Sequence, residues 1–518
     1  MKMNTFETNI REIFEDPHQP VLEHRIGSGV FGQEYIKAYM AWYKHMGVPL
    51  TMMPYIKDQH GKFVNQDGSE ILRDSTRERK VIRNYLSSQR PDYQEELRRL
   101  AESLPPMLSE CRVAIQIPAH NEEMNIYHTL KQWASQLSLE GELFEPSIYE
   151  INVLNNGPRG YKRDKTLAEV ERFQKDFPYV NMNVLDIEFL IETGNVGMAR
   201  KLLTDILLQR SLNRPNQTGP LYLESADADV LEIDKHTLMK RIQRLDSKAY
   251  LDAVAGRLDF CPKILMQNDY LFFFLRAKKI AKVLLRDYTL RPDRNNDFSF
   301  YNRVATSGWN TAFTAEAYAL IGGYLPVKQN ESYDMKRRMS IMRGTADNQG
   351  RFIPNTYTVE KIFTRMQSSP RRHIHAVAKD TRPNLDFADM QRMAEIRELN
   401  PYAMASTLPY ERLSQENIAV FEEVLTKQWQ FFARTVKNPA NRLRVFRRLM
   451  LFLGFGRYQI SENEDGSSTV RNSRVSNEDS TNWNLDYHIT PDGQVAIDNI
   501  GNLKDAFDRY REKHTCAC

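Results

Sequence analysis

From residue 111 onward, short apolar runs alternate with segments in which apolar residues recur at helical spacing. The apolar runs that we expect to form strands are residues 112–118, 149–154, 180–187 and 221–223. The segments between them that we expect to form helices are residues 124–137, 167–177 and 197–210. Strands that alternate with helices predict an α/β fold with a doubly wound, mostly parallel sheet. Ligands of such sheets bind at the carboxyl ends of the strands.

Polar residues follow these strands one after another. Residues 118–123 (PAHNEE) follow the first strand, and residues 155–157 (NNG) follow the second. Residues 194–200 open a helix, where free backbone N–H groups and the helix dipole favour an anion. Asp227 and Asp229 follow the strand 221–223. Each feature alone would be an ordinary turn or cap, but their succession at strand ends predicts one ligand site.

Asp227 and Asp229 stand two positions apart at the end of a short strand. In an extended backbone such side chains point to the same face, so both carboxylates could hold one ion. Hard oxygen ligands suit Mg²⁺ or Mn²⁺, which takes one or two carboxylates and completes its shell with phosphates. An isolated pair would more often be two surface aspartates. The position of this pair among the other polar strand ends favours a metal site.

The regions on either side of residues 111–380 have different patterns. Residues 1–110 are expected to form a mostly helical extension, with helices around 33–45 and 77–104. The G-x-G-x-x-G at residues 27–32 is interpreted as a turn before a helix, because no good strand precedes it. Residues 381–460 are expected to be helical, and residues 461–518 to form a polar loop and a short C-terminal cap.

Further segments are assigned by the same patterns. We expect helices at residues 232–245, 270–285, 315–321 and 335–342, and a strand at 249–258. Residues 442–455 (RLRVFRRLMLFLGF) are basic and amphipathic. This stretch could lie on an acidic membrane surface, but a helix packed on the main domain is favoured.

Composition limits the classes of function. The chain has 518 residues, which allows two or more domains, and a net charge of +4 with 27% charged residues argues against nucleic acid as the main partner. Its four cysteines have no zinc-site spacing and suit a reducing compartment. The N-terminus lacks the apolar core of a signal peptide, and no run of eighteen apolar residues predicts a transmembrane helix. We therefore expect a cytoplasmic protein.

In their order along the chain, these motifs resemble those of nucleotide-sugar glycosyltransferases of the GT-A fold, in particular the large family 2 type. The resemblance covers residues 113–375 and includes VAIQIPAHNEE, the N-x-G-x-A-R of residues 195–200, Asp227-Ala-Asp229 and the segment 308–324 that ends in Gly-Gly-Tyr. It implies a GT-A domain at residues 111–380 and a sugar donor carried on a nucleoside diphosphate.

The resemblance also assigns binding roles. The nucleotide sugar would be bound by Pro118, Ala119, Asn121, Glu122, Asn156, Asn195, Gly197, Arg200, Asp227, Arg371 and Arg372. The cofactor would be Mn²⁺ or Mg²⁺, with ligands from Asp227, Asp229, His373 and His375. For the two histidines, a basic surface loop is the alternative.

The proposed catalytic base departs from the family pattern. In inverting members a Glu-Asp pair begins the helix beside the acceptor, and the aspartate takes the acceptor proton. Here the matching residues are Glu331 and Ser332. Glu331 is therefore the first candidate base and Asp334, one helical turn on, is the second. A retaining reaction, or one without a base at this place, remains open.

The resemblance implies a hexosyltransferase that moves a single sugar to an unidentified acceptor, which could be a small molecule, a glycan, a lipid or a protein. Processive synthesis is not expected, because the Q-x-x-R-W signature is missing after Gln367 and no transmembrane helix is predicted. One alternative is a sugar-phosphate nucleotidyltransferase, although its glycine-rich, lysine-bearing loop is absent after the first strand. Another is a GT-A-fold binding protein that has lost catalysis, which Ser332 favours. Peripheral membrane contact also stays open, and the oligomeric state is not predicted.

Overall fold

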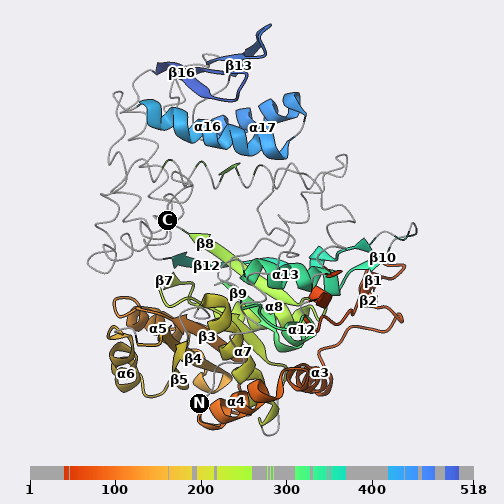
Figure 1. The fold of residues 1–518 in the computed structure, drawn as a ribbon, viewed down its shortest axis with the longest axis vertical. Coiled ribbons are helices and arrows are strands. Elements are labelled where there is room, and N and C mark those ends of the chain that lie inside the picture. The colour runs from red at the N-terminus through yellow and green to blue at the C-terminus, as the bar shows by residue number, and fades with distance from the viewer. Residues whose placement is uncertain are drawn as a thin grey trace. The chain divides into compact units, whose positions relative to one another are not determined.

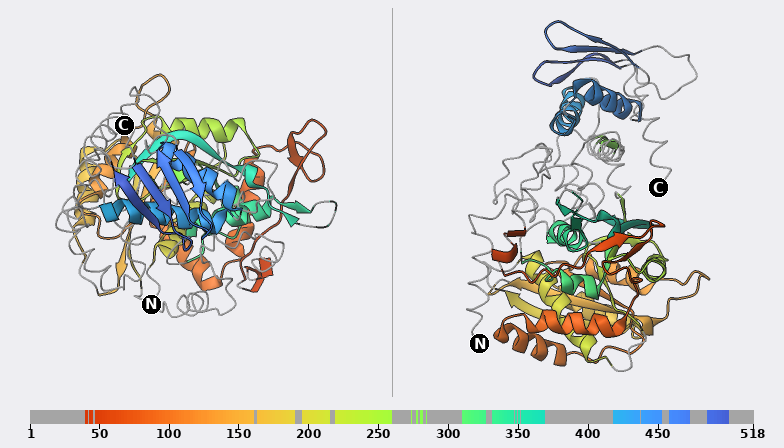
Figure 2. Two further views of the ribbon diagram at one scale, coloured as in Figure 1. Left: turned by 90° about the horizontal axis from the view of Figure 1, so that it is seen from above. Right: turned by 90° about the vertical axis from the view of Figure 1, so that its right-hand side faces the viewer.

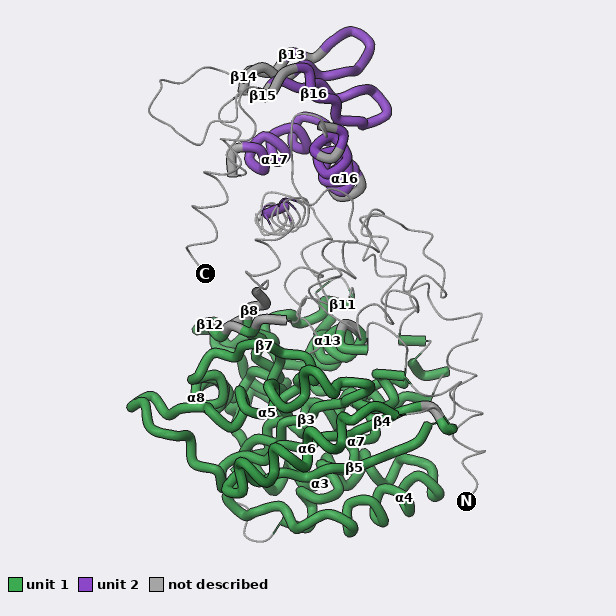
Figure 3. Tube along the Cα trace, turned by 90° about the vertical axis from the view of Figure 1, so that its left-hand side faces the viewer, with its two compact units in different colours: residues 1–22, 31–259, 300–367 green, residues 23–30, 260–299, 368–518 purple. Residues whose placement is uncertain are grey.

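The computed structural model describes most of the chain between residues 40 and 500 (Figure 1). The described residues are 40–41, 43–45, 47–160, 163–189, 195–214, 219–259, 273, 277, 280–281, 284, 310–326, 331–346, 348, 350, 352–368, 418–436, 438–452, 458–472 and 485–500. The chain forms two compact units, which Figure 3 distinguishes by colour. The first comprises residues 1–22, 31–259 and 300–367, and the second comprises residues 23–30, 260–299 and 368–518.

Among the described residues, the first unit contains an eight-stranded sheet with the strand order β5-β4-β3-β6-β9-β8-β12-β7. Its strands are β3 (Val113–Ala119), β4 (Tyr149–Pro158), β5 (Met182–Phe189), β6 (Tyr222–Ser225), β7 (Val230–Ile233), β8 (Ala253–Asp259), β9 (Thr311–Thr314) and β12 (Val359–Ser368). Strands β5, β4, β3 and β6 pair in parallel, as do β8 and β12, whereas β9 runs antiparallel to β6 and β8. The predicted α/β fold with a mostly parallel sheet is confirmed.

Helices cover both faces of this sheet. On one face lie α7 (Val196–Leu212), α12 (Ala315–Leu320) and α13 (Glu331–Met342), and α3 (Ser75–Ser87) and α4 (Pro91–Glu102) pack against α7 from outside. The other face packs against α5 (Ile126–Ala134), α6 (Thr166–Asp176) and α8 (Thr237–Ser247). Neighbouring residues of β3 alternate between the two cores, with Ala114 in the first and Ile115 in the second. This alternation follows from the pleat and explains why the strand is a continuous apolar run.

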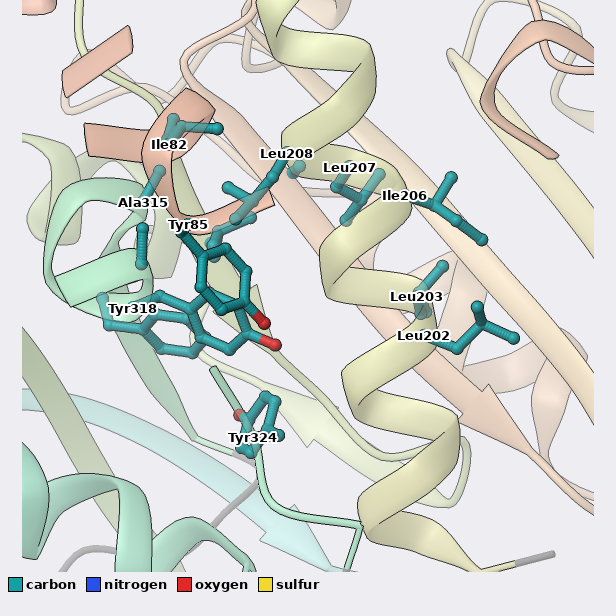
Figure 4. Packing of buried hydrophobic residues seen from close by; sticks show 14 of the residues in the cluster. Ile82, Tyr85, Leu202, Leu203, Ile206, Leu207, Leu208, Ala315, Tyr318 and Tyr324 are labelled. Atoms are coloured by element: carbon teal, nitrogen blue, oxygen red, sulfur yellow. The ribbon is translucent and has the colours of Figure 1, made fainter. Parts of the chain in front are cut away.

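Helix α7 is buried over most of its length. It lies between the sheet and the N-terminal helices, and its apolar side chains belong to one buried cluster with Tyr85 and Tyr318, part of which Figure 4 shows. A helix that is apolar on most sides belongs in a core. α7 therefore holds a fixed position, and side chains near its N-terminus have a rigid base.

The smaller elements of the first unit lie at its periphery. Two short antiparallel hairpins are formed by β1 (Tyr55–Lys57) with β2 (Phe63–Asn65) and by β10 (Thr345–Ala346) with β11 (Phe352–Ile353). Two 3₁₀ turns, η1 (Pro146–Ile148) and η2 (Thr356–Thr358), precede β4 and β12. Figure 2 gives two further views of these elements around the central sheet.

The second unit combines a helix pair with a sheet. Helices α16 (Ile418–Thr435) and α17 (Pro439–Phe452) accompany a four-stranded antiparallel sheet of described strands β13 (Tyr458–Glu462), β14 (Ser468–Asn472), β15 (Leu485–Ile489) and β16 (Val495–Ile500). Thr426 of α16 accepts a hydrogen bond from the Val495 N–H at 2.9 Å, and Glu422 accepts one from the Ile497 N–H at 2.8 Å. These side chains of α16 fix β16 along the helix.

Several predictions from the sequence differ from the structure. The helix predicted at 77–104 is two helices, because Pro91 begins α4 and its ring cannot continue α3. Strands β7, β9 and β12 were not predicted. Strands β13 and β14 occupy part of the stretch expected to be a polar loop, since their alternating polar residues pair as a hairpin.

Residues 442–452 of the basic stretch lie in α17, and the ring of Phe446 packs against other rings of the second unit. Phe446 of this helix contacts Trp429 and Tyr487 through edge-on ring packing. In the predicted helix 270–285, the described residues Phe273, Ala277, Ala281 and Leu284 are helical and buried. None of the helices in the described part of the chain has both the length and the hydropathy needed to cross a bilayer.

Candidate functional site

The order of the sheet marks a ligand-binding position between β3 and β6. From β3 the chain first builds outward through β4 and β5, and later returns to place β6 on the other side of β3. At such a reversal the loops after the two strands diverge and leave a crevice at the carboxyl edge of the sheet. The residues that follow β3 and β6 are residues 120–125 and 226–229, which contain the predicted site residues Asn121, Glu122, Asp227 and Asp229.

Asp227 and Asp229 lie in the connection between β6 and β7, where residues 228–229 form a turn. The argument that an extended backbone points both side chains to one face therefore does not apply to them. Thr129 of α5 holds this turn, because its Oγ1 lies 2.8 Å from the Ala228 carbonyl oxygen and accepts a hydrogen bond from the Val230 N–H at 3.0 Å. Both aspartates are buried, with 5% and 1% of their surface exposed.

Arg200 of α7 reaches the connection between β6 and β7 from the face of the sheet opposite to α5. One terminal nitrogen, Nη1, donates to the Ser225 Oγ at 2.7 Å and to the Ala226 carbonyl at 3.3 Å. The other, Nη2, donates to Asp227 Oδ1 at 2.5 Å. Only 1% of Arg200 is exposed. Its guanidinium is thus a fixed positive charge at the end of β6.

Glu331, the first residue of α13, is the second carboxylate beside this guanidinium. Its Oε1 lies 3.4 Å from Arg200 Nε, and the residue is buried. Arg200 therefore stands between Asp227, which follows β6, and Glu331, which lies much later in the chain. The structure brings together three residues that the sequence assigned to different parts of the site. A planar guanidinium has donors along several edges, which lets it serve two carboxylates at once.

Asp334 lies one turn further along α13 in a different environment. Its Oδ1 accepts a hydrogen bond from the Tyr43 hydroxyl at 2.5 Å, and its Oδ2 accepts one from Arg338 Nε at 2.8 Å. Arg338 also donates to the Ile321 carbonyl. Asp334 thus connects α13 to Tyr43, and each of its oxygens has a protein donor.

The loop after β3 is held by its own polar residues. Asn121 has a φ of 54°, a left-handed conformation that asparagine tolerates better than most residues. The backbone N–H of Glu122 donates to Thr166 Oγ1 at 2.8 Å, and Glu122 Oε2 accepts from Asn125 Nδ2 at 3.0 Å. Part of the hydrogen bonding of Glu122 therefore shapes this loop.

Two other predicted residues join β3 to β4. Asn156 Nδ2 donates to the Ala119 carbonyl at 2.8 Å, and its own carbonyl lies 2.8 Å from the His120 Nδ1. Pro118 and Ala119 end β3 and are half-buried and buried, respectively. These contacts bring the predicted base-binding residues of the two strands to one edge.

The N-terminus of α7 begins beside this edge with Asn195 as its cap. Asn195 Oδ1 accepts from the Met198 N–H at 2.9 Å, and its Nδ2 donates to the Pro326 carbonyl at 3.3 Å. Gly197 lies buried in the first turn. The capping side chain satisfies one of the free N–H groups at the helix start and ties it to the segment after Tyr324.

Some contributors to the site carried no signal in the sequence. Thr129 and Ser225 are ordinary residues whose roles appear only when the helices and strands are assembled. Tyr324 belongs to the Gly-Gly-Tyr segment, and its hydroxyl donates to Ser225 Oγ at 3.4 Å. Burial raises the pKa of Tyr324 to about 12, with Arg200 acting in the opposite direction.

A divalent cation is implied by the family resemblance, and the side chains present can be tested against it. The described residues contain no group of three or more His, Cys, Asp or Glu placed to hold a metal. Two carboxylates in one short connection are nonetheless the ligand set that Mg²⁺ or Mn²⁺ uses when phosphates and water complete its shell. Asp227 and Asp229 fit that chemistry. Arg371, Arg372, His373 and His375 lie outside the described residues.

Several solved structures resemble the chain in part. S. aureus TarS 1-349 is 13% identical with a TM-score of 0.32, over 70% of this chain and 98% of that chain. The mannosyltransferase PcManGT from Pyrobaculum calidifontis, in complex with GDP-Man and Mn²⁺, is 14% identical with a TM-score of 0.32, over 72% and 86% of the two chains. Glucosyl-3-phosphoglycerate synthase from Mycobacterium tuberculosis, in complex with Mn²⁺, UDP-glucose and phosphoglyceric acid, is 12% identical with a TM-score of 0.28, over 60% and 82%.

No protein-family model and no curated protein sequence matches the chain. The TM-scores of the solved structures are too low for the likeness to carry a structural argument. The assignment to the α/β class therefore depends on the strand order and the parallel pairing of the sheet itself.

Proposed function

We propose that the first unit is a metal-dependent glycosyltransferase that moves one sugar at a time from a nucleotide-diphosphate donor to an acceptor. The observation that carries this proposal is the meeting of Asp227 and Glu331 at Arg200, beside the reversal point of a parallel sheet. A transferase needs one group at the leaving diphosphate and another at the attacking hydroxyl. Two carboxylates from separate segments, held by one buried cation, supply such a pair.

On the donor side, the residues that end β3 and β4 would contact the nucleoside. Ala119 and Asn156 are joined by a hydrogen bond, so both keep a fixed position for a base or ribose. The start of α7, with Asn195 and Gly197, would face the diphosphate, because a helix N-terminus favours negative charge. When bound, Mn²⁺ or Mg²⁺ at Asp229 and Asp227 would neutralise charge that develops on the leaving diphosphate.

On the acceptor side, Glu331 would take the proton of the attacking hydroxyl. The new bond forms between that oxygen and the anomeric carbon while the bond from this carbon to the diphosphate breaks. Glu331 suits the role better than Asp334, because both oxygens of Asp334 already accept hydrogen bonds within the protein. Arg371 and Arg372 remain predicted diphosphate contacts, and His373 and His375 remain predicted metal ligands.

A catalytically inactive binding protein is the second candidate. Its support is the ion pair between Arg200 and Asp227, which uses one oxygen of the first aspartate, together with serine at position 332. Such a protein would bind a nucleotide sugar without releasing nucleoside diphosphate. The two candidates therefore differ in a single measurable product.

The test is incubation of the full chain with Mn²⁺ and a panel of nucleotide sugars, in which water takes the place of the acceptor and receives the sugar, followed by detection of the released nucleoside diphosphate. We expect release with one donor and its loss in Asp229→Ala, with circular dichroism unchanged. Asp176→Ala, which removes an exposed carboxylate on α6, is the matched control and should keep full activity. An unchanged rate in Asp229→Ala would refute the metal assignment.

Other products would point to the alternatives. Release of pyrophosphate from a nucleoside triphosphate and a sugar phosphate would indicate a nucleotidyltransferase. Saturable binding of a nucleotide sugar without any release would indicate the binding protein. The result of this assay does not depend on peripheral membrane contact or on the class of acceptor.

A further inference from the structure

We propose that the exposed face of helix α17 binds an anionic lipid bilayer through arginine side chains, chiefly those of Arg444 and Arg448. Helix α17 belongs to the second unit, so this contact is separate from the sugar transfer proposed for the first unit. The contact is electrostatic, because the apolar side of the helix is buried in the protein.

The apolar side of α17 is occupied by packing. Val445, Phe446, Leu449 and Met450 are all buried, and the ring centroid of Phe446 lies 5.3 Å from that of Trp429 on α16. An amphipathic helix that lies in a membrane inserts its apolar face among the lipids. The apolar face of α17 is not available for insertion, so what remains for an external partner is the opposite face.

Three arginines occupy that opposite face. Arg444, Arg447 and Arg448 are each exposed, and their spacing of three and four positions places them on one side of the helix. The last turn of α17 contains no basic residue, so attraction to the helix dipole does not account for them. Like charges one turn apart repel each other, and an external anion would offset that repulsion.

Two of these arginines are not neutralised by the protein. Neither Arg444 nor Arg448 forms an ion pair or a hydrogen bond through its side chain with the residues that the structure describes. An exposed arginine of α4 shows the contrast, because Arg99 pairs with Glu96 at 2.6 Å. The guanidinium groups of Arg444 and Arg448 are therefore open to an anion from outside the chain.

The sequence around α17 concentrates positive charge. Residues 424–461 contain eight lysines and arginines and no aspartate or glutamate. The whole chain has 71 basic and 67 acidic residues, so without these eight it would have a net negative charge. The positive charge is thus local to this part of the chain, and a negatively charged surface is the partner that complements it.

A bilayer fits this face better than a nucleic acid or an acidic protein. Anionic headgroups present a plane of phosphates, and a guanidinium pairs with phosphate oxygens through two parallel donors. Proteins that bind single-stranded nucleic acid add exposed aromatic rings to the charge, whereas Phe446 of α17 is buried. A protein interface needs an apolar centre, which the exposed arginine face does not offer. Basic clusters on a helix are typical of binding to acidic membrane surfaces.

The test is co-sedimentation of the full chain with vesicles made of equal parts of phosphatidylcholine and phosphatidylglycerol. We expect binding to these vesicles and none to pure phosphatidylcholine. Arg444→Gln/Arg448→Gln should weaken the binding about 25-fold, because each cation at an anionic surface strengthens binding about fivefold. Raising NaCl from about 0.1 M to about 1 M should abolish the binding, since the Debye length falls from about 10 Å to about 3 Å.

Two further variants make the comparison specific. Arg83→Gln/Arg98→Gln is the matched control, because it removes two exposed arginines from α3 and α4 in the first unit. It should change vesicle affinity by less than about twofold, since these charges lie on other helices. Arg444→Lys/Arg448→Lys keeps both charges and should bind within about threefold of the unaltered protein. The replaced side chains are exposed, so circular dichroism should stay the same in every variant.

Several results would overturn the proposal. These are absence of vesicle binding by the unaltered protein, full binding by Arg444→Gln/Arg448→Gln, and an equal loss in the matched control. Binding of a labelled single-stranded RNA that depends on Arg444 and Arg448, without vesicle binding, would identify a nucleic-acid surface instead and would also overturn it. No nucleotide sugar is present in these assays, so their outcome is separate from that of the donor assay.

Discussion

The hydroxyl of Tyr43 donates a hydrogen bond of 2.5 Å to Asp334, a residue 291 positions later in the chain. Burial raises the pKa of Tyr43 well above its usual value, and the carboxylate of Asp334 acts in the same direction. The phenol is therefore a stable donor. This bond, together with the ion pair to Arg338, indicates that Asp334 holds α13 in place.

Replacing Asp334 by Asn tests that structural role. Loss of the charge leaves buried Arg338 without its ion-pair partner, so we expect the free energy of unfolding to fall by about 3–5 kcal/mol. Tyr43→Phe should cost only about 1 kcal/mol, because it removes one hydrogen bond. Urea denaturation followed by circular dichroism measures both. A loss of turnover without loss of stability in Asp334→Asn would make Asp334 the base instead.

Asp205 of α7 should be a major contributor to the stability of the first unit. Its carboxylate accepts hydrogen bonds from the hydroxyls of Tyr85, Tyr93 and Tyr318 at 2.9, 2.8 and 3.1 Å, and it pairs with Lys201 at 2.8 Å. Removing this charge by Asp205→Asn leaves the Lys201 ammonium without its ion-pair partner and weakens three hydrogen bonds. We expect a loss of about 3–5 kcal/mol in the free energy of unfolding.

Asp92→Asn on the surface of α4 is the control for Asp205→Asn, because its ion pair with Arg90 is exposed. It should change the free energy of unfolding by less than about 0.5 kcal/mol. Tyr93→Phe should lie between the two variants, near 1 kcal/mol. Equal stability of Asp205→Asn and Asp92→Asn would contradict the central role of Asp205.

Gly323→Ala should destabilise the protein because two effects coincide at this position. Its φ is 77°, and an added Cβ would lie 2.2 Å from the Tyr85 hydroxyl oxygen. Gly160 has the same φ of 77° and no atom within 4 Å of its Cβ position, so Gly160→Ala measures the backbone strain alone. We expect about 1 kcal/mol for Gly160→Ala and at least 2 kcal/mol more for Gly323→Ala.

The destabilisation caused by the contact between the added Cβ and the Tyr85 hydroxyl can be measured separately. In a Tyr85→Phe background the nearest oxygen is gone, so the cost of Gly323→Ala should fall toward that of Gly160→Ala. Thermal unfolding of the four variants gives the comparison. The Gly-Gly-Tyr motif is then explained by a positive φ and by the close approach of Tyr85, before any role at the acceptor is considered.

The ion pairs of Glu360 predict a dependence of stability on pH. Partial burial raises the pKa of Glu360, but Arg244 of α8 and Lys248, which follows that helix, lower it by more, and the net shift is downward. A carboxyl whose folded pKa is depressed stabilises the fold above its unfolded pKa, which is roughly 4.3 for glutamate. This contribution is lost as the pH falls through the folded pKa.

Glu360→Gln should therefore be less stable than the unaltered protein at pH 6, and the difference should shrink as the pH is lowered below about 4. Denaturation midpoints measured across this range give the result. Glu70→Gln is the control, because Glu70 pairs with Lys62 at the surface, where water and salt weaken the interaction. A difference that grows on acidification would reverse the sign assigned to Glu360.

The sequence predicted the part of the fold in which apolar runs and helical periods are long. Strands β3, β4 and β5 and helix α7 overlap the ranges expected from hydrophobic spacing, because each buries residues at the period of its own geometry. Strand β7 was missed because its four residues adjoin a helical pattern. Strands β9 and β12 were missed as well, and their places in the sheet depend on contacts with segments far away in sequence.

In the candidate site too, features of local sequence were predicted and contacts between distant segments were not. Asn156, Asn195 and Asp227 were predicted because they stand at strand ends or at a helix start, which are features of local sequence. The pairing of Arg200 with Glu331 was not predicted, since no motif near either residue indicates a contact with the other. The sequence also did not predict that Glu331 and Asp334 have different partners, because the partners of Asp334 depend on the positions of Tyr43 and Arg338.

By itself, the sequence determined that this protein has a mostly parallel α/β sheet and that polar residues follow its strands. Alternating apolar spacing is enough for that, because burial and backbone geometry act over a few residues. Only the tertiary structure decided that Asp227 and Glu331 share one buried arginine and that Asp334 pairs with Tyr43 and Arg338. The contacts of Arg200 with Glu331 and of Tyr43 with Asp334 join groups more than a hundred positions apart in the chain, in an interior where the low dielectric constant and the exclusion of water strengthen each interaction.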